Sequence, residues 1–242
     1  MPETLEPVFR SDVTAQLVKH SATDSDVLFA ARVSTIGEQS LAELDKQPDR
    51  SKGLINYLMR SKHGSPFEHN SMTFLVSAPI FVFREFMRHR VGWSYNEESG
   101  RYRELDPVFY IPGPDRKLVQ EGKPGHYQFV AGTDEQHKLV NAAMEDSYRQ
   151  AYAAYQRMLA AGVAREVARS VLPVGLFSSA YATCNARSLM HFLGLRTTHP
   201  DAAVKSYPQR EIAMVAEQME AAWAELMPLT YAAFNANGRI AP

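Results

Sequence analysis

The chain has 242 residues, of which 45% are hydrophobic and 22% are charged. This composition excludes a disordered chain, and no apolar stretch approaches the ~20 residues that a membrane-spanning helix requires. Basic and acidic residues number 26 and 27, so the chain has no overall charge that would recruit nucleic acid or an anionic membrane. We therefore expect a single domain over residues 1–242, with neither nucleic acid nor a membrane as a partner.

The beginning of the chain and its cysteine content indicate a compartment. Met1–Pro7 is acidic and is interrupted by prolines, unlike a secretory signal peptide. Cys184 is the only cysteine, so no internal disulfide can form, which fits a reducing environment. We expect a cytoplasmic protein.

The first predicted elements mix strands and helices. Apolar residues alternate with polar ones from about Phe9 to Lys19 and predict a strand, and Asp24 is placed to cap the helix that follows. Lys52–Arg60 is predicted as a helix, with Gly64 suited to a left-handed position just after it. Met72–Ser77 predicts a second strand.

The middle of the chain is richer in turn residues. Pro79 is suited to the first turn of a helix from Ile80 to His89. Ser94–Arg103 is polar and is predicted as a loop, followed by a short extended run at Val108–Ile111. Turn residues cluster over Pro112–Gly132, which predicts a surface loop.

Helices dominate the remainder. Thr133 and Gln136 form a capping-box pattern that begins a long helix to Ala161, where Gly162 stops it. The later predicted helices are Arg165–Leu172, Ala186–Leu195 and Pro208–Met227. Long helices with few strands predict an α+β fold with a small, mostly antiparallel sheet.

A polar loop after the predicted helix 80–89 carries the first set of candidate functional residues. Ser99, Gly100 and Arg101 offer a hydroxyl, an unhindered backbone N–H and a bidentate guanidinium, which are the groups that bind a phosphate monoester. The basic run at residues 88–90 can bind an anion or can simply interact with the carbonyl end of its helix. Both interpretations remain open from the residues alone.

The predicted helix at residues 186–195 carries the second set. Its apolar arc holds Ala186, Leu189, Met190 and Leu193, and polar residues lie on two edges beside it. Asn185 and Arg196 share one azimuth, while Arg187 and His191, four residues apart, share another. A surface helix can have this pattern without any function, but a ligand or a neighbouring subunit would also explain it.

The order of these motifs resembles the flavin-dependent thymidylate synthases. Arg88-His89-Arg90, followed by Ser99-Gly100-Arg101-Tyr102, is similar to the signature of that family. Similar blocks occur in the order of the family at residues 31–34, 63–69, 78–82, 165–173 and 185–196. The resemblance covers the chain from about residue 30 to residue 215. It implies a flavin-dependent thymidylate synthase-like fold.

The resemblance implies which residues bind ligands. The predicted FAD contacts are Ser65, Arg88, His89, Arg90, Glu97, Asn185, Arg187 and His191. The predicted dUMP contacts are Glu85, Phe86, Met87, Arg88, Glu97, Glu98, Ser99, Gly100, Arg101, Arg169 and Arg196. The family is a homotetramer that uses methylenetetrahydrofolate and NADPH to convert dUMP to dTMP, and no metal is expected.

The resemblance also implies electrostatic rather than covalent catalysis. We expect Arg196 to stabilise charge that develops on the pyrimidine near N3. Cys184 is expected to be a buried, inert residue, because reduced flavin supplies the hydride and no enzymic nucleophile is required. Ser99 has no evident catalytic partner in the sequence, so a phosphate-binding hydroxyl is the expected role.

Three positions depart from the family pattern. Eight residues separate Arg90 from Ser99, one more than the family has, and Gly92 is placed to absorb the extra residue. Glu85 occupies a position where glutamine is expected. The connection from Thr197 to Tyr207 is longer than usual.

Alternatives from other classes remain open at this point. One alternative is a flavoprotein that acts on a different nucleotide. A nucleic-acid-binding module would use Arg84, Arg88, Arg90, Arg101 and Arg103, and a metal enzyme would use His63, Glu68 and His69. His63 and His89 either tune flavin or folate or pack in the core. The same two alternatives, folate pocket or core, hold for Trp93, Tyr95 and Tyr102.

Overall fold

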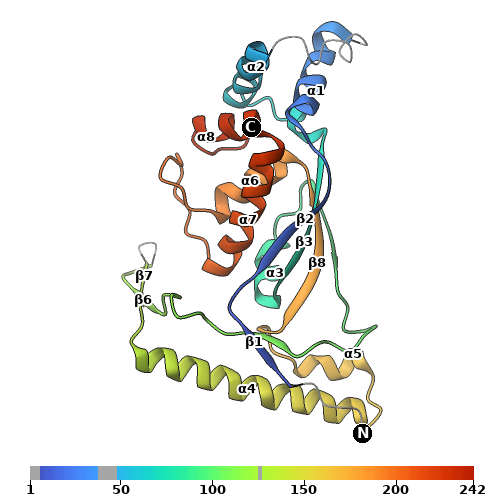
Figure 1. Ribbon diagram of the computed structural model, residues 1–242, viewed down its shortest axis with the longest axis vertical. Helices are drawn as coiled ribbons and strands as arrows, with labels where there is room; N and C mark the ends of the chain where they lie inside the picture. The colour runs from blue at the N-terminus through green and yellow to red at the C-terminus, as the bar shows by residue number, and fades with distance from the viewer. Residues whose placement is uncertain (1–5, 38–47, 125–126) are drawn as a thin grey trace. The chain divides into compact units, whose positions relative to one another are not determined.

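The computed structural model describes residues 6–37, 48–124 and 127–242, which form the expected α+β architecture (Figure 1). Contacts divide the chain into two compact units. The first unit contains the residues up to Asp12, with Ala78–Phe81 and Glu98–Ser178. The second contains Val13–Ser77, Val82–Glu97 and Ser179–Pro242. Residues 1–5, on which part of the signal-peptide argument depends, lie outside the described residues.

The largest sheet has four strands in the order β2-β3-β8-β4. These strands are β2 (Thr14–Ser21), β3 (Ser71–Pro79), β8 (Phe177–Cys184) and β4 (Trp93–Glu97). β2 pairs antiparallel with β3, and β4 pairs antiparallel with β8 so that Trp93 lies opposite Cys184. Met72, Phe74 and Val76 alternate along β3 and are fully buried, which is the period-two pattern of a strand. The small antiparallel sheet is therefore confirmed.

Helices pack around this sheet within the second unit. They are α1 (Asp24–Ile36), α2 (Pro48–Arg60), α6 (Ala186–Arg196), α7 (Arg210–Leu226) and α8 (Pro228–Ala236), with a short 3-10 helix, η2 (Ser65–Glu68). Helix α7 contacts β2, α6 and α8, and α6 also contacts η2. Ile212, Val215 and Trp223 on α7 are buried. None of the described helices is both long and apolar enough to cross a membrane.

The first unit is organised around one long helix. Its elements are β1 (Val8–Arg10), β5 (Val108–Tyr110), β6 (Val119–Glu121), β7 (Gln128–Val130), α4 (Asp134–Ala160), α5 (Arg165–Ala168) and the 3-10 helix η3 (Arg169–Val171). β1 and β5 are parallel, and β6 pairs antiparallel with β7. The remaining helix, α3 (Ile80–Phe86), begins in the first unit and continues in the second.

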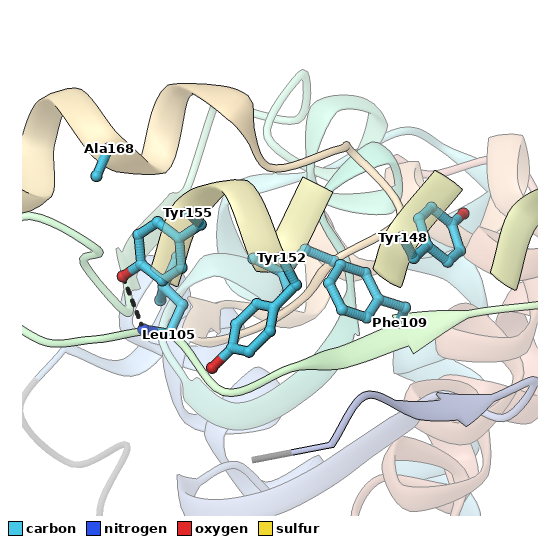
Figure 2. Close-up of a cluster of buried hydrophobic side chains, with 7 residues drawn as sticks. Leu105, Phe109, Tyr148, Tyr152, Tyr155 and Ala168 are labelled. Carbon is cyan, nitrogen blue, oxygen red and sulfur yellow. Dashed lines mark hydrogen bonds between the residues drawn. The ribbon is translucent and has the colours of Figure 1, made fainter. Parts of the chain in front are cut away.

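Tyrosines on α4 form the core of the first unit. Tyr148, Tyr152 and Tyr155 project from successive turns of the helix toward β5 (Figure 2). The ring of Tyr148 stacks on that of Phe109 with centroids 4.8 Å apart. The Tyr155 hydroxyl accepts a hydrogen bond from the Leu105 backbone N–H at 3.3 Å. This aromatic layer fixes α4 to the strand that follows the Ser99–Arg101 loop.

The predicted start and end of α4 are confirmed. Thr133 is the N-cap, its hydroxyl accepts from the Gln136 N–H at 3.2 Å, and the Gln136 side chain accepts from the Thr133 N–H at 2.8 Å. Gly162 has a φ of 80°, which is the left-handed conformation that glycine adopts without strain.

Several predicted boundaries are wrong. The strand predicted at 9–19 is two strands, β1 and β2, which belong to different units. The loop predicted at 94–103 begins as strand β4, and the loop predicted at 112–132 contains β6 and β7. Strand β8 and helix α8 were not predicted. Strands β4 and β8 are paired with each other across a long stretch of sequence, whereas β6 and β7 pair locally.

Two predicted caps are also wrong. Thr23, not Asp24, is the N-cap of α1. The Asp24 carboxylate instead accepts from the backbone N–H groups of Leu229 and Thr230, each at 2.8 Å, at the start of α8. After α2, the left-handed residue is Lys62 (φ 60°), not Gly64. Helix α3 ends at Phe86, three residues before the predicted end.

Candidate active site

Helix α6 and its N-cap carry four of the predicted site residues. The chain leaves β8 and turns into the helix at Asn185, whose Oδ1 accepts from the Ser188 N–H at 2.9 Å. The side chain of Asn70 accepts from the Ala186 N–H at 2.8 Å. These two bonds satisfy backbone donors that a helix start leaves free, and they fix its direction. The predicted apolar arc of α6 is fully buried, which confirms the periodicity.

A cavity of about 420 Å³ lies beside the start of α6 in the second unit. Five of the eight predicted FAD residues line it: His89, Arg90, Asn185, Arg187 and His191. Its other lining residues are Glu68, Val91, Gly92, Trp93 and Ser188. Ser65 begins η2, the short helix that also carries Glu68, while Arg88 and Glu97 are exposed in the same unit and do not line the cavity.

Arg187 is held in the cavity wall by two acceptors. Its Nη1 lies 2.5 Å from Oε1 of Glu68, and its Nε donates to the carbonyl oxygen of Pro242 at 2.7 Å. The guanidinium lies directly against the backbone of Gly64, where a Cβ would be 2.5 Å from the arginine Cζ. Glycine at position 64 therefore allows this arginine to approach the backbone, which is the physical reason for that residue.

Gly92, which lines the cavity, has a comparable role. Its φ of 68° lies in the left-handed region, and a Cβ there would collide with the Ser188 hydroxyl. That hydroxyl donates to the carbonyl oxygen of Val91 at 2.8 Å, which joins the Arg90–Trp93 turn to α6. The glycine accommodates the tight turn between α3 and β4, as expected for the position of the extra residue.

Aromatic packing supports the segment Arg88-His89-Arg90. Phe86 is fully buried, in contact with the rings of Trp93, Tyr95 and Phe192. Trp93 and Tyr95 stack with centroids 5.7 Å apart, and the Tyr95 hydroxyl donates to the His89 carbonyl oxygen at 2.8 Å. This contact fixes the backbone just beyond α3. Because the Phe86 side chain is enclosed, a nucleotide could meet only its backbone.

Arg196, the predicted catalytic residue, is fixed by two side chains from the end of α3. Its Nη1 lies 2.7 Å from Oε2 of Glu85, and its Nε donates to Nε2 of His89 at 3.2 Å. The Arg196 and Glu85 side chains are 18% and 28% exposed. An arginine is always protonated, so His89 accepts through Nε2 and carries its proton on Nδ1. The unexpected glutamate at position 85 is thus the counterion of Arg196.

His89 is neutral in this environment. Burial, together with the positive charge of Arg196 and the proximity of His191, lowers the pKa of His89 from 6.5 to about 4. Burial and the charges of Arg187 and Lys62 also lower the pKa of His191. Neutral imidazoles in the cavity leave the positive charge to arginines, which do not titrate in the physiological range.

The predicted phosphate-binding residues lie in the first unit. The Ser99 hydroxyl accepts from the Arg101 N–H at 3.3 Å, and the Ser99 carbonyl accepts from the Tyr102 N–H at 3.0 Å. Arg101 pairs with Glu166 of α5 at 2.9 Å, and both side chains are about half exposed. The loop is a compact turn, and its arginine is held by a solvent-exposed ion pair and lies over the ring of Tyr102.

Gly100 brings this turn close to Arg169. A Cβ at position 100 would lie 2.7 Å from Cδ1 of Leu105 and 3.2 Å from Cδ of Arg169. The glycine therefore permits Arg169 to lie against the Ser99–Arg101 turn. Glu98 also belongs to the first unit and pairs with Arg103 at 3.0 Å. The other predicted dUMP contacts, at 85–88, 97 and 196, belong to the second unit.

Cys184 is confirmed as a buried residue. Its side chain lies inside the sheet at the end of β8, and burial raises the pKa of its thiol. A thiol in this state is a poor nucleophile. Among the residues that the structure describes, no group of three or more His, Cys, Asp or Glu side chains is arranged to hold a metal ion. Glu68, proposed for a metal site in one alternative, pairs with Arg187 instead.

The structure adds cavity residues that the sequence did not single out as ligand contacts. Glu68, Val91 and Ser188 line the cavity, and Glu68 is the ionic partner of a predicted flavin residue. The sequence suggested Glu68 only for the metal-site alternative, and the four-residue spacing of α6 gave no sign that Arg187 pairs with it. Ser188 follows Arg187 directly and was hidden among the apolar residues of the helix.

Comparisons with known proteins identify the class to which this fold and cavity belong. A family model described as "Thymidylate synthase complementing protein" matches residues 16–229, which is most of the chain. The chain therefore belongs to the family of flavin-dependent thymidylate synthases.

Individual relatives match along nearly the whole length. A flavin-dependent thymidylate synthase from Streptomyces avermitilis is 79% identical over 240 residues, covering 99% of this chain and 98% of the relative. One from Tropheryma whipplei strain TW08/27 is 58% identical over 238 residues, covering 98% of each. A crystal structure of the UMP/dUMP methylase PolB from Streptomyces cacaoi, bound with 5-Br dUMP, is 59% identical, with a TM-score of 0.92 over 97% of this chain and 100% of that one.

Proposed function

We propose that this protein converts dUMP to dTMP, with 5,10-methylenetetrahydrofolate as the one-carbon donor, FAD as the cofactor and NADPH as the reductant. The overall reaction consumes dUMP, methylenetetrahydrofolate, NADPH and a proton, and yields dTMP, tetrahydrofolate and NADP⁺. Family membership supports this assignment. We further propose that the protein acts in the cytoplasm as a homotetramer of single-domain chains, as the family resemblance implies.

One observation carries the proposal: His89 joins the cavity to Arg196. The histidine lines the cavity that five predicted flavin residues surround, and its Nε2 accepts a hydrogen bond from Arg196 at 3.2 Å. The guanidinium expected to act on the pyrimidine therefore lies directly behind the wall of the proposed flavin site. Such proximity is what hydride delivery to a nucleotide requires.

The cavity residues fit a flavin dinucleotide. Arg90, Arg187 and Asn185 supply the donors that a pyrophosphate or an isoalloxazine carbonyl accepts, and Trp93 and His89 supply flat surfaces for a ring. Gly64 and Gly92 keep the walls close by omitting side chains. When bound, FAD supplies the hydride that completes the methyl group.

The chain's own contribution at the pyrimidine is electrostatic. Glu85 and His89 fix Arg196 through Nη1 and Nε, so Nη2 remains to donate toward a uracil oxygen beside N3. A positioned guanidinium stabilises negative charge that spreads from N3 to the ring oxygens and makes C5 more nucleophilic. Neither the buried Cys184 thiol nor Ser99 is required as a nucleophile.

The phosphate of dUMP is proposed to bind at Ser99, Gly100, Arg101 and Arg169. A dianion recruits both guanidinium groups and outcompetes the exposed Glu166 partner of Arg101. Glu98 and its partner Arg103 stiffen the beginning of the turn.

A spectroscopic and isotopic experiment tests the proposed function. Protein reconstituted with FAD should be yellow, should bleach with NADPH, and should release tritium from dUMP labelled at C5 only when folate donor and NADPH are both present. Omitting each component in turn is the control. Protein that stays colourless with saturating FAD and forms no dTMP would refute the proposal.

A second candidate substrate is UMP. The similar PolB structures are described as those of a UMP/dUMP methylase, one bound with 5-Br dUMP and one with 5-Br UMP. Parallel assays with UMP and dUMP, at equal concentration, would decide between the two. We expect dUMP to be preferred, because the relatives with 79% and 80% identity are named as thymidylate synthases. A higher kcat/KM for UMP would reassign the protein to the alternative flavoprotein activity.

A further inference from the structure

Arg239 is a buried cation that none of the proposed ligand sites uses. Its side chain is 2% exposed and pairs with Glu220 of α7, which is 13% exposed, through contacts of 2.6 Å and 2.8 Å. Its Nη1 also donates to Asn235 at 2.7 Å, and the guanidinium lies over the ring of Phe234. The backbone has a φ of 57°, a left-handed conformation that is unfavourable for arginine. A buried ion pair, supported by the bond to Asn235, holds this strained residue in place.

The same guanidinium reaches the end of α6. Arg239 Nη2 donates to the Thr197 hydroxyl at 2.8 Å, and this hydroxyl donates to the Leu193 carbonyl oxygen at 2.7 Å. The Thr197 N–H also donates to Leu193 at 3.0 Å, and the Ser206 hydroxyl donates to the Thr197 carbonyl oxygen. Thr197 directly follows Arg196, so these bonds fix the backbone that carries the proposed catalytic guanidinium.

Beyond Arg239, the chain reaches the opposite end of α6. A Cβ on Gly194 would lie 3.2 Å from the carbonyl oxygen of Arg239, so the helix and the segment are in close contact there. Pro242 is buried, and its carbonyl oxygen accepts from Arg187 Nε at 2.7 Å. The segment Arg239–Pro242 thus contacts α6 near its last turn through Arg239 and near its first turn through Pro242.

We propose that Arg239–Pro242 is a splint that positions the two functional arginines of α6: Arg196 through the Arg239–Thr197 contact, and Arg187 through the Pro242 carbonyl. The proposal rests on the proposed function, because it assigns Arg196 to turnover and Arg187 to FAD. It makes Arg239 and Thr197 positioning residues for a reaction in which neither touches a ligand.

The two contacts should affect different steps. Arg196 acts on the pyrimidine, so loss of its support should lower turnover while FAD still binds. Arg187 lies in the cavity wall, so loss of its support should weaken FAD binding, while turnover at saturating FAD should be retained. A purely structural role of the segment would affect stability and leave both functional measurements unchanged for the folded, flavin-loaded protein.

The first experiment compares Thr197→Val with Thr197→Ser. Valine preserves the shape of threonine but removes the hydroxyl that Arg239 reaches, whereas serine keeps it, and Arg239 stays paired with Glu220 in both variants. For Thr197→Val we expect kcat per bound flavin to fall by about 10-fold, because a small misplacement of a catalytic group slows turnover strongly. The KM for dUMP should change little, and Thr197→Ser should restore kcat to near the parent value.

The second experiment removes residues 240–242 and leaves the Arg239–Glu220 pair intact. Flavin fluorescence titration should give an FAD Kd about 10-fold higher, as expected for the loss of one charge-assisted hydrogen bond to Arg187. Turnover at saturating FAD should stay close to that of the parent. Lys62→Ala is the matched control, because Lys62 Nζ also donates to the carbonyl oxygens of Ile240 and Ala241 without contacting Arg187. Both titrations are run at pH 8, where His191, whose pKa the charge of Lys62 lowers, is neutral with or without that charge.

The outcomes separate this proposal from the proposed function. If the parent protein neither binds FAD nor forms dTMP, the proposed function itself is refuted. If the parent is active, the splint is refuted by unchanged kcat in Thr197→Val, by equally slow Val and Ser variants, or by an unchanged FAD Kd in the shortened chain. An FAD Kd raised equally in Lys62→Ala would assign the effect to docking of the segment rather than to Arg187.

Discussion

Two arginines with different proposed roles lie in contrasting environments. Arg196, in the second unit, is 18% exposed and has two acceptors, the Glu85 carboxylate and neutral His89. Arg101, in the first unit, is 53% exposed, and its partner Glu166 is equally accessible to water. The guanidinium assigned to chemistry is thus held rigidly, and the one assigned to binding is held loosely.

This difference matches what each step requires. Stabilising charge in a transition state depends on donors that are oriented beforehand, because reorganisation at the moment of reaction would add to the barrier. Binding a phosphate dianion tolerates an arginine that exchanges partners, because an exposed ion pair contributes only about 0–1 kcal/mol and is readily replaced. Changes at the two sites should therefore separate turnover from affinity.

The largest effect is expected at the rigid site. Arg196→Ala should lower kcat by roughly 100-fold or more, since the loss of one oriented donor typically adds about 3–4 kcal/mol to the barrier. Binding of dUMP, measured by calorimetry, should persist because the phosphate contacts remain. Unchanged turnover in the flavin-loaded variant would remove Arg196 from the mechanism.

At the loose site, Arg101→Ala should weaken the binding of dUMP rather than slow turnover. We expect its Kd to rise by about 10-fold, which corresponds to one hydrogen bond to a charged group, with kcat nearly preserved. Ser99→Ala should act in the same direction and to a smaller extent. Deoxyuridine, which lacks the phosphate, is the control ligand, and its Kd should not respond to either change. Lost chemistry with intact dUMP binding would instead make one of these residues catalytic.

A glycine pair tests how tightly the cavity wall is built. In Gly64→Ala, the new Cβ would displace the Arg187 guanidinium, so the FAD Kd should rise by roughly 5-fold from weakening of a charge-assisted contact. Gly53→Ala is the matched control in α2, where a Cβ meets nothing within 4 Å and should stabilise the protein by roughly 0.5–1 kcal/mol. Equal FAD affinity in the two variants would show that Arg187 is not part of the flavin site.

Acid should loosen the rigid site. The pKa of His89 is about 4 in the folded protein and 6.5 ordinarily, so between these values the unfolded chain binds the proton and the folded chain does not. Stability should therefore be greatest above pH 6.5 and fall as the pH drops toward 4. His89→Gln, which keeps an acceptor for Arg196, should show a smaller loss between pH 7.5 and pH 5 in urea unfolding. An equal loss in both proteins would assign the acid sensitivity to other groups.

The smallest effect on activity is expected at Cys184. Cys184→Ala removes a buried sulfur and should cost about 1 kcal/mol of stability, the usual scale for a single substitution. Turnover should match the parent, because the thiol contacts no ligand in the proposed site. A loss of dTMP formation with normal FAD binding would indicate covalent catalysis and would contradict the electrostatic mechanism.

Local patterns in the sequence predicted the parts of the fold that local forces determine. The apolar arc of α6 and the capping box of α4 depend on residues three or four apart, and both were correctly predicted. Strand β4 was predicted as a loop because its polar residues form a strand only by pairing with β8, which lies over 80 residues later. Asp24 was assigned to its own helix because nothing nearby in the sequence reveals α8.

The candidate site shows the same division. The family resemblance selected five residues that line one cavity. It could not predict that Glu68 pairs with Arg187, or that Glu85 pairs with Arg196, because each pair joins residues more than 100 positions apart. Gly64 was interpreted as a helix cap, whereas its actual role depends on an arginine that arrives from α6.

The bond between Asp24 and α8 also constrains the order in which the protein can fold. Asp24 accepts hydrogen bonds from Leu229 and Thr230, which lie 205 and 206 positions later in the chain. Helix α1 therefore cannot reach its final neighbours until the ribosome has made α8. Contacts of such long range slow folding, because a large loop must close before any stabilisation is gained. The second unit should consequently complete its folding only once α8 has been made, and nascent chains that end before α8 should remain sensitive to protease in this unit.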